Sequence, residues 1–537
     1  MKAKVEFRTE KYHLNISKEF IHDDLYEDNQ LIVFVRGNGY WTSPAKWLNS
    51  KDIAILHQTA NLKLDEIDGT FSIAIQDKKN GELKLFSDHL NFFPFYYKKL
   101  KGSFVISDSL ASFKDEELNE LGVTEMVALG SVLGEKTIFN GVNKFPGASI
   151  TIIDNHGDLK FNQYWKCTTI PTSEKEFREV FSETLRLIPK LSSSASLTLT
   201  AGLDSRMVLS QLIKDDIEIN TFTFGHPKSD DMKIASKIAE NFEINHTAYK
   251  MHAQNDEFTH LLHTLLEENQ QYTDGMINSL KSLHTNYCTR KEAEAHDMII
   301  TAGGELVYSH YAEVPTIKKK DNSSIKSIAN FLIDFNIESK LISSDILREI
   351  KDDLTKILSR YNFDNNQLYY DAFYLEKLTS LTAYTLQIIS AKTRVFNPIF
   401  AKKMIGHSLG LPARSRRKRN FQRRLIVENN SLMNKYLVNG FKVVIPTLKT
   451  YTIAKIAYAF RLCKKGINKI MKREVFMMSY IQYANFIDKN AALMELVKGD
   501  LSLEQLIDFK KNRLKRTNLN LKILNHWISK NHEDPEK

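Results

Sequence analysis

Short apolar or alternating segments, separated by turn-forming residues, run through the first third of the chain. The clearest of them lie at 30–36, 71–76, 83–87, 104–107 and 148–153. Alternation with a period of two places the apolar side chains on one face of a strand, and the intervening Gly, Asn, Asp and Pro favour turns. The pattern predicts an antiparallel sheet domain that ends near residue 170, with one hairpin turn at 37–39.

The pattern changes after that boundary. Ser173, with Glu176 three residues on, has the spacing of a helix capping box. From about 195 to 305 strands alternate with helices. The predicted strands are 196–200, 218–224 and 298–301, and the predicted helices are 206–213 and 232–242. Such alternation is typical of a parallel sheet, which binds ligands at the carboxyl ends of its strands. Beyond about residue 325 the pattern is nearly all helical.

Length and composition describe a globular protein of several domains. The chain has 537 residues, of which 42% are hydrophobic and 26% charged, so about two to four domains are expected. Cys167, Cys288 and Cys463 lie more than a hundred positions apart, which excludes a paired-cysteine zinc site and a disulfide framework. The charged start lacks the apolar core of a signal peptide, and no run is long enough to span a membrane. We expect a cytoplasmic protein.

The positive charge is concentrated in one segment. The formal net charge is +9, and seven basic residues without an acid fall within 414–424. They are Arg414, Arg416, Arg417, Lys418, Arg419, Arg423 and Arg424. Such a run faces either a polyanionic or acidic partner or plain solvent.

The segment 196–206 carries the clearest candidate chemistry. An apolar strand runs into small residues and then into a helix whose first turn has unpaired backbone N–H groups, a geometry that binds anions. The loop consists of Thr200, Ala201, Gly202, Leu203, Asp204 and Ser205. Its small residues let the backbone approach a phosphate, Ser205 adds a donor, and Asp204 suits a Mg²⁺ ion on the same phosphates. The alternative is an ordinary strand-to-helix turn with an Asp or Ser cap.

This loop resembles the SGGxDS pyrophosphate loop of the asparagine synthetase family. Further segments resemble that family's landmarks in the same order, from about residue 25 to 445. They are the strand at 64–75, the "RDxxGxxPLYY" segment at 86–97, the second strand and helix at 223–235, the acidic "SGxGxDExF" loop at 300–308, and the "RxPFxD" and "LP" landmarks at 394–400 and 411–412. An ordered set is more specific than any single motif.

The resemblance implies a fold and a division into domains. Residues 1–168 would form a glutamine amidotransferase type 2-like domain, of the α+β Ntn-hydrolase-like αββα kind. Residues 175–450 would form an α/β parallel-sheet ATP pyrophosphatase domain of the PP-loop kind, which is adenine-nucleotide alpha-hydrolase-like. A basic helical extension would follow at 451–537.

The resemblance also implies an activity. ATP would adenylate a carboxylate, aspartate by default, and the acyl group would pass to ammonia or another amine with release of AMP and pyrophosphate. ATP and Mg²⁺ are the implied cofactors, with Asp204 and Glu305 as metal-binding and catalytic residues. The implied ATP and pyrophosphate site adds Phe224, Gly303 and Gly304 to the loop residues 200–205. Lys418 or Arg419 would supply catalytic positive charge, and Asp274 and Gly275 match a substrate-side loop, although Asp-Gly is also a common turn.

Several positions depart from the family pattern. Lys2 stands where the family has its glutamine-hydrolysing cysteine, and the nearest cysteine is Cys167. An amine cannot replace a thiolate near neutral pH, so we expect the glutaminase activity to be lost. Ala201 replaces a glycine and Leu306 replaces a second acid beside Glu305.

Other functions fit parts of the same evidence. The basic run favours a tRNA-modifying PP-loop ATPase, and Leu306 with the missing catalytic Lys favours a catalytically impaired scaffold. Glutaminase-deficient relatives that build other amides are a further alternative. On the amide-forming interpretation, the partners are a small-molecule carboxylate and an amine, without nucleic acid or membrane, and a homodimer is left open.

Overall fold

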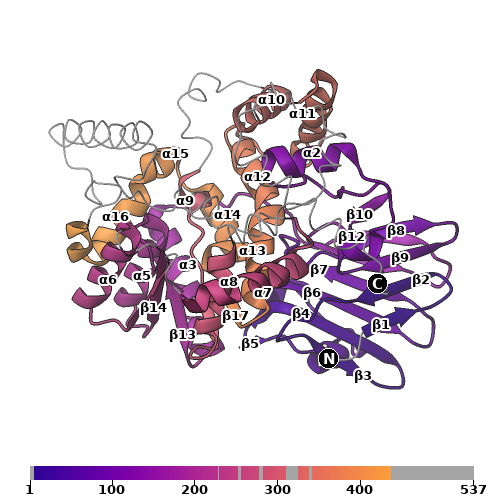
Figure 1. The fold of residues 1–537 in the computed structure, drawn as a ribbon, viewed down its shortest axis with the longest axis horizontal. Coiled ribbons are helices and arrows are strands. Elements are labelled where there is room, and N and C mark those ends of the chain that lie inside the picture. The colour runs from indigo at the N-terminus through magenta and orange to yellow at the C-terminus, as the bar shows by residue number, and fades with distance from the viewer. Residues whose placement is uncertain are drawn as a thin grey trace.

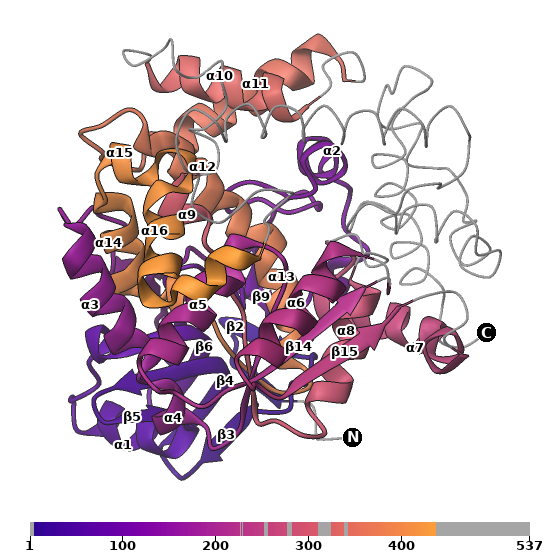
Figure 2. The ribbon, with the colours of Figure 1, turned by 90° about the vertical axis from the view of Figure 1, so that its left-hand side faces the viewer.

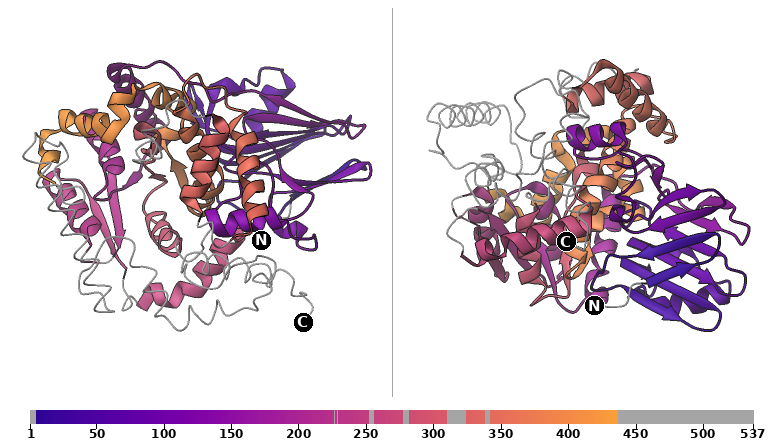
Figure 3. Two further views of the ribbon diagram at one scale, coloured as in Figure 1. Left: turned by 90° about the horizontal axis from the view of Figure 1, so that it is seen from above. Right: turned by 45° about the vertical axis from the view of Figure 1, so that its right-hand side comes forward.

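The computed structural model describes residues 5–225, 227, 229–251, 256–276, 282–309, 324–337 and 342–436. It has an N-terminal part built of two largely antiparallel sheets and a larger α/β and helical part beside it (Figures 1 and 3). The extension predicted at 451–537 and the cysteine Cys463 lie outside the described residues. Within the described ranges, no helix combines the length and the apolar character that crossing a membrane requires.

The N-terminal part contains two sheets. The first has the order β1 (Val5–Arg8), β2 (Tyr12–Ile16), β9 (Ser103–Ser107), β8 (Tyr96–Leu100), β10 (Val142–Lys144). The second has the order β12 (Leu159–Gln163), β11 (Ser149–Ile153), β7 (Leu83–Ser87), β6 (Ile67–Asp77), β4 (Leu31–Thr42), β3 (Asp24–Glu27), with β5 (Ala45–Trp47) on β4. Neighbouring strands are antiparallel except β2 and β9, which are parallel.

Four layers follow from the burial pattern of these strands. Alternate residues of β2, such as Tyr12 and Leu14, are buried and pack against Phe34 and Leu85 of the second sheet. Helix α1 (Ser50–Gln58) covers the other face of the second sheet, and α2 (Glu120–Leu129) covers the outer face of the first. The order is therefore helix, sheet, sheet, helix, because each sheet buries both of its faces.

The hairpin predicted at 37–39 is wrong, because β4 continues through it and pairs with β6 over eleven residues. The glycines serve close packing inside the sheet. Gly37 has φ +94°, and an added Cβ would lie 2.5 Å from the Thr70 carbonyl oxygen and 2.7 Å from the Phe93 ring. Glycine is needed where another part of the chain approaches the backbone this closely.

The second part contains a five-stranded parallel sheet (Figure 2). Its order is β15 (His246–Lys250), β14 (Asn220–Gly225), β13 (Ala195–Thr198), β16 (Met298–Ile300), β17 (Arg394–Phe396). The associated helices are α3 (Glu174–Leu185), α4 (Ile188–Leu191), α5 (Leu203–Lys214), α6 (Asp230–Asn241), α7 (Asp256–Thr273), α8 (Leu283–Glu292) and α9 (Glu305–Tyr308). Every strand pair is parallel, as the alternation of strands and helices predicts. The capping box of Ser173 and Glu176 is confirmed at the start of α3.

Helices make up most of the described residues between 324 and 436. They are α10 (Ile325–Asn336), α11 (Ser344–Leu358), α12 (Leu368–Lys377), α13 (Ala383–Ser390), α14 (Lys402–Gly410), α15 (Ala413–Arg416) and α16 (Asn420–Asn429). The prediction of a nearly all-helical region misses β17, which joins the parallel sheet beside β16. Three residues are too few for periodicity to identify a strand.

Candidate functional site

The turn between β13 and α5 lies at the carboxyl end of a central strand of the parallel sheet. Thr200 organises it: its N–H donates to Ser205 Oγ at 3.0 Å, and its hydroxyl accepts from the Gly202 N–H at 3.0 Å. No side chain of the described residues caps α5, and the cap position is occupied by Gly202. The first-turn amides of α5 therefore remain uncapped by side chains, which is what an anion site at a helix N-terminus requires.

Two of the predicted phosphate-binding residues make other bonds within this turn. Ser205 Oγ holds the Thr200 amide and lies 3.1 Å from the Thr200 hydroxyl. The Ala201 N–H donates to Asp231 Oδ1 at 2.9 Å, and the Ala201 carbonyl accepts from Arg206 Nη2 at 2.9 Å. In this arrangement Ala201 and Ser205 shape the turn, and the amides of the α5 first turn are left for an anion.

The two predicted metal-binding acids lie at the ends of adjacent strands. Asp204 is in the first turn of α5 after β13, and Glu305 opens α9 after β16, which pairs with β13. Burial raises the pKa of Glu305, and the negative charge of Asp204 raises it further. Tyr374 donates a hydrogen bond to Glu305. Repulsion between two half-buried carboxylates is the electrostatic condition that a cation relieves.

The glycine pair before Glu305 brings the two loops into contact. A Cβ added at Gly304 would overlap Asp204 Oδ1, and a Cβ added at Gly303 would lie 2.7 Å from the Phe400 ring. Phe224, the remaining predicted nucleotide-binding residue, is half-buried near the end of β14. The loop after β16 thus has room for the Asp204 carboxylate only because residue 304 lacks a side chain.

Of the two candidate cations, the structure brings Arg419 to the acids. Arg419 Nη1 lies 3.8 Å from Asp204 Oδ1, and its guanidinium carbon lies 3.6 Å from the ring centre of Tyr308. Lys418 is exposed, and no ion pair of its side chain occurs among the described residues. A guanidinium stacked on an aromatic ring is held in place while its N–H groups stay free for phosphate oxygens.

Gln422 is a site residue that the sequence does not reveal. It lies on α16, its side chain is 1% exposed, and its Nε2 donates to Asp204 Oδ1 at 2.6 Å. A neutral amide within a basic helix matches no motif. Only its position four residues before the buried Ile426 could have suggested an inward-facing side chain.

The basic run of 414–424 is divided between the interior and the surface. Arg416 is buried, pairs with Asp371 at 2.9 Å and donates to the Leu306 carbonyl at 2.6 Å. Arg424 pairs with Glu174. Arg414 and Arg417 are exposed like Lys418. The concentration of charge in the sequence therefore does not form one continuous surface patch.

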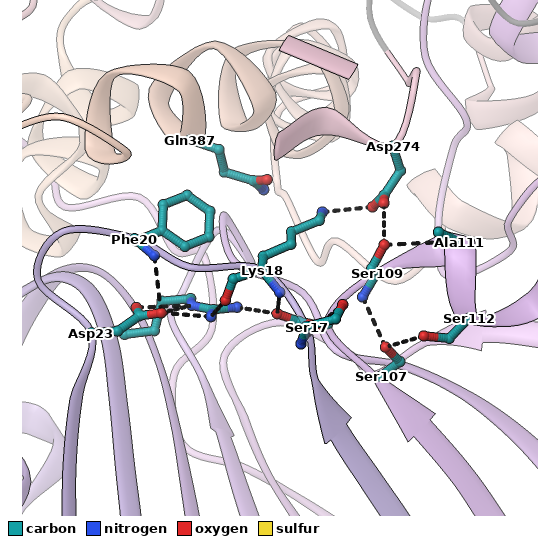
Figure 4. A network of polar contacts seen from close by, with 12 residues as sticks. Ser17, Lys18, Phe20, Asp23, Ser107, Ser109, Ala111, Ser112, Asp274 and Gln387 are labelled. Atoms are coloured by element: carbon teal, nitrogen blue, oxygen red, sulfur yellow. Dashed lines mark hydrogen bonds and ion pairs between the residues drawn. The ribbon is translucent and has the colours of Figure 1, made fainter. Parts of the chain in front are cut away.

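The predicted substrate residues Asp274 and Gly275 lie in a turn at the junction of the two parts (Figure 4). Asp274 is buried, with Oδ2 at 2.6 Å from Lys18 Nζ and Oδ1 accepting from Ser109 at 2.5 Å. Both residues have positive φ, in keeping with the turn that Asp-Gly predicts. The carboxylate of Asp274 is thus engaged by the N-terminal part.

Lys18 belongs to a buried network of charges in the N-terminal part (Figure 4). Arg36 forms a bidentate pair with Asp23, through Nε at 3.0 Å and Nη2 at 2.7 Å, and its Nη1 lies 2.5 Å from Asp108. Asp108 also accepts from the backbone of Ser17 and Lys18. The cationic neighbours outweigh burial and lower the pKa of Asp108. We call Lys18, Asp23, Arg36, Asp108 and Asp274 the junction network.

Other polar contacts join the two parts around β17. Asn38 of β4 donates to the Ser390 hydroxyl at 2.7 Å and accepts from the Val395 N–H at 3.0 Å. Arg394 donates to the Gly37 carbonyl at 2.6 Å, and His89 lies 2.6 Å from the Phe400 carbonyl. The N-terminal part is therefore bonded directly to the fifth strand of the parallel sheet.

Two family models match the chain, one in each part. The glutamine amidotransferase domain matches residues 53–165, and the asparagine synthase domain matches residues 176–304. The chain has an asparagine synthetase-like two-domain architecture. The second match supports an ATP-dependent, amide-forming ligase of the PP-loop family as the functional class of this synthetase-like domain. A search of curated proteins found no match.

Three solved structures have a low similarity to this asparagine synthetase-like chain. The NH₃-dependent NAD synthetase from Campylobacter jejuni is 11% identical over 34% of this chain and 94% of its own, with a TM-score of 0.20. The NMN synthetase from Francisella tularensis is 16% identical over 38% and 94%, with a TM-score of 0.20. The glutamine phosphoribosylpyrophosphate amidotransferase from B. subtilis is 8% identical over 42% and 72%, with a TM-score of 0.19. TM-scores this low carry no weight for fold or function.

Proposed function

We propose that this protein is an ATP-dependent ligase that adenylates a carboxylic acid and transfers the acyl group to an amine. The observation that carries the proposal is the meeting of Asp204, Glu305 and Arg419 beside the uncapped start of α5. Each kind of group binds phosphate in its own way. The two acids bind it through a cation, Arg419 binds it directly, and the amides at the start of α5 bind it through hydrogen bonds. Aspartate is the first acid to test, since it is the substrate that the family resemblance implies.

The residues present fit a magnesium ion. Asp204 and Glu305 offer carboxylate oxygens, and no group of three His, Cys, Asp or Glu side chains arranged for a metal occurs among the described residues. Mg²⁺ is commonly held by one or two carboxylates together with substrate phosphates and water. Such an ion would neutralise charge that develops on the departing diphosphate.

The chain's own groups then divide the work. The amides at the start of α5 bind the diphosphate, and Arg419 offers positive charge to the same oxygens. A carboxylate oxygen of the acid attacks the α-phosphorus of ATP, and pyrophosphate leaves. The amine next attacks the acyl carbon, AMP leaves, and the amine gives up a proton. Tyr374 and Tyr308 hold Glu305 and Arg419 in place.

The proposal includes a glutaminase-inactive N-terminal domain at about 1–168 and a synthetase domain at about 175–450. The four layers support an Ntn-hydrolase-like αββα fold for the first. No cysteine precedes Cys167 in the sequence, and burial raises the pKa of the Cys167 thiol to about 12. A thiol with that pKa is not a nucleophile near neutral pH. The amine is therefore free ammonia or an amino compound.

The acid-dependent release of pyrophosphate tests the proposal. The full chain is incubated with ATP, Mg²⁺, ammonium and one carboxylic acid at a time, beginning with aspartate, and pyrophosphate, AMP and the mass of the product are measured. We expect one acid to give all three products in equal amounts, and Asp204→Ala to give none. Release that needs no acid, or that survives in Asp204→Ala, would contradict the ligase.

The impaired-scaffold alternative has one specific observation in its favour, since Ala201 and Asp204 are already engaged by Asp231 and Gln422. It predicts nucleotide binding without pyrophosphate release for every acid. The tRNA-modifying alternative loses support, because Arg416, Arg419 and Arg424 each face an acidic side chain of this chain.

A further inference from the structure

The amide of Gln422 lies between the two loops that carry the acids. Helix α16 packs Phe421, Leu425 and Ile426 into the same core as Met207 and Val208 of α5, which fixes its orientation against that helix. Gln422 Nε2 donates to Asp204 Oδ1 at 2.6 Å, and a Cβ added at Gly304 would lie 2.9 Å from the same nitrogen. The amide therefore touches both the α5 side and the α9 side of the site.

The carbonyl oxygen of that amide has no hydrogen-bond partner among the described residues. Gln422 Oε1 is buried and accepts no hydrogen bond from the described residues. A buried carbonyl oxygen without a partner has lost its hydration, so a water, an ion or a ligand is expected to complete it. Exchanging the two amide atoms does not help, because an oxygen would then face the Asp204 carboxylate.

The two acids offer few protein oxygens as ligands for a cation. Asp204 and Glu305 are its acids, and the next residue, Leu306, is apolar and fully buried. An amide carbonyl is an oxygen of the kind that Mg²⁺ and Mn²⁺ accept, directly or through a bound water. Gln422 thus has an unsatisfied oxygen, within the described part of the chain, beside a pair of carboxylates that repel each other.

We propose that Gln422 is the third protein oxygen of the Asp204–Glu305 site, with Nε2 fixing Asp204 and Oε1 facing a divalent cation or its water. This inference rests on the proposed function, since it takes the nucleotide-bound cation as the ligand. It assigns α16, which lies beyond the residues matched by the asparagine synthase model, to the metal site.

Cation binding to the full chain provides the test. Mn²⁺ is titrated in the presence of α,β-methylene-ATP and followed by electron paramagnetic resonance, and pyrophosphate release is measured separately. Gln422→Met keeps the length of the side chain and removes its oxygen. We expect about a 10-fold weaker affinity for Mn²⁺, with a matching loss of pyrophosphate release. Gln163→Met, at an exposed position on β12, is the matched control and should bind Mn²⁺ normally.

Gln422→Glu separates an oxygen donor from a residue that only holds Asp204. It keeps an acceptor but loses the N–H donor, so we expect Mn²⁺ affinity equal to or tighter than that of the unaltered chain. If Gln422 only holds Asp204, this variant binds Mn²⁺ more weakly, because a third carboxylate repels the first. That result overturns the inference, as does unchanged affinity in Gln422→Met. This comparison remains valid if Gln422→Met fails to fold.

The proposed function fails in a different way. If the unaltered chain binds no Mn²⁺ with the nucleotide and Asp204→Asn changes nothing, the ligase itself is contradicted. If the unaltered chain and Asp204→Asn behave as proposed while Gln422→Met binds Mn²⁺ normally or Gln422→Glu binds it more weakly, only the role of Gln422 is lost.

Discussion

The junction network and the Asp204 site are both clusters of charge, yet they differ in how fully their polar atoms are paired. In the junction network Arg36, Asp108 and Lys18 each have several partners, and none of their buried polar atoms lacks a hydrogen bond. In the Asp204 site the two acids repel each other and Gln422 Oε1 is unsatisfied. In a cluster that stabilises the fold, the polar atoms are paired with one another. In a cluster that binds a ligand, some polar atoms stay unpaired until the ligand binds.

The strongest way to break this comparison is to remove the centre of the junction network. Arg36→Met leaves Asp23 and Asp108 buried without their cation, and breaking a buried ion pair in this way costs roughly 3–5 kcal/mol. We expect a loss near the upper end of that range in the free energy of unfolding, measured by urea titration. Arg348→Met, which removes an exposed pair with Asp345, should cost less than about 1 kcal/mol. Equal losses in the two variants would show that the network does not stabilise the fold.

Lys18→Met tests the junction network a second time, because the stability that this variant loses should depend on pH. Burial already raises the pKa of Asp274, and removing Lys18 raises it further, so the folded state holds this proton more tightly than the unfolded chain does. The loss of stability should be absent well below the ordinary Asp pKa and grow as pH rises above it, to roughly 3 kcal/mol.

Thermal unfolding of Lys18→Met between pH 4 and 8 measures this effect. Adding Asp274→Asn should restore most of the stability at pH 8, because Asn is neutral and tolerates the positive φ of residue 274. A loss independent of pH would mean that Lys18 acts through packing.

In the Asp204 site we expect substitution to have little effect on stability and a large effect on activity. Asp204→Asn keeps an oxygen for Gln422 and removes the charge that repels Glu305, so the free energy of unfolding should be unchanged or higher by about 0.5 kcal/mol. Loss of one metal-binding charge should slow pyrophosphate release by about 100-fold or more. Both quantities are measured on the same preparation. A strongly destabilised variant would place Asp204 among the structural charges.

The smallest effect is expected at the exposed part of the basic run. Replacing Arg414, Arg417 and Lys418 together with Ala removes charge that has no role in the proposed chemistry. The free energy of unfolding should stay within about 0.5 kcal/mol of the unaltered value. The rate of pyrophosphate release should be unchanged. A large loss of activity would identify these residues as part of a docking surface for a polyanionic substrate.

Residues with a local signature were predictable from the sequence, and residues brought in by tertiary packing were not. The strand, turn and helix around Asp204 follow from an apolar run, small residues and amphipathic spacing, so β13 and α5 appear where expected. Glu305 follows from the resemblance of its glycine-rich loop to the acidic loop of the asparagine synthetase family. Gln422 does not, since its role comes from the packing of α16 on α5 rather than from any motif.

The same distinction applies to the fold. β17 is three residues long and becomes a strand only by pairing with β16, almost a hundred positions earlier in the chain. The glycines at 37–39 predict a turn because glycine is conformationally free, whereas in the structure they make room for Phe93 and Leu48 within a strand. Local propensity cannot distinguish these two uses of glycine.

The bonds from Asn38 and Gly37 to β17 also set an order of events during synthesis. The open edge of β16 can receive its last neighbour only after residue 396 has left the ribosome, long after the N-terminal sheets have emerged. Until then the unpaired edge of β16 and the surface of β4 that contacts β17 are both exposed and can pair with other chains. Folding of this chain should therefore depend on chaperones during translation, and a nascent chain stopped before Arg394 should aggregate more readily than one stopped after the end of α14.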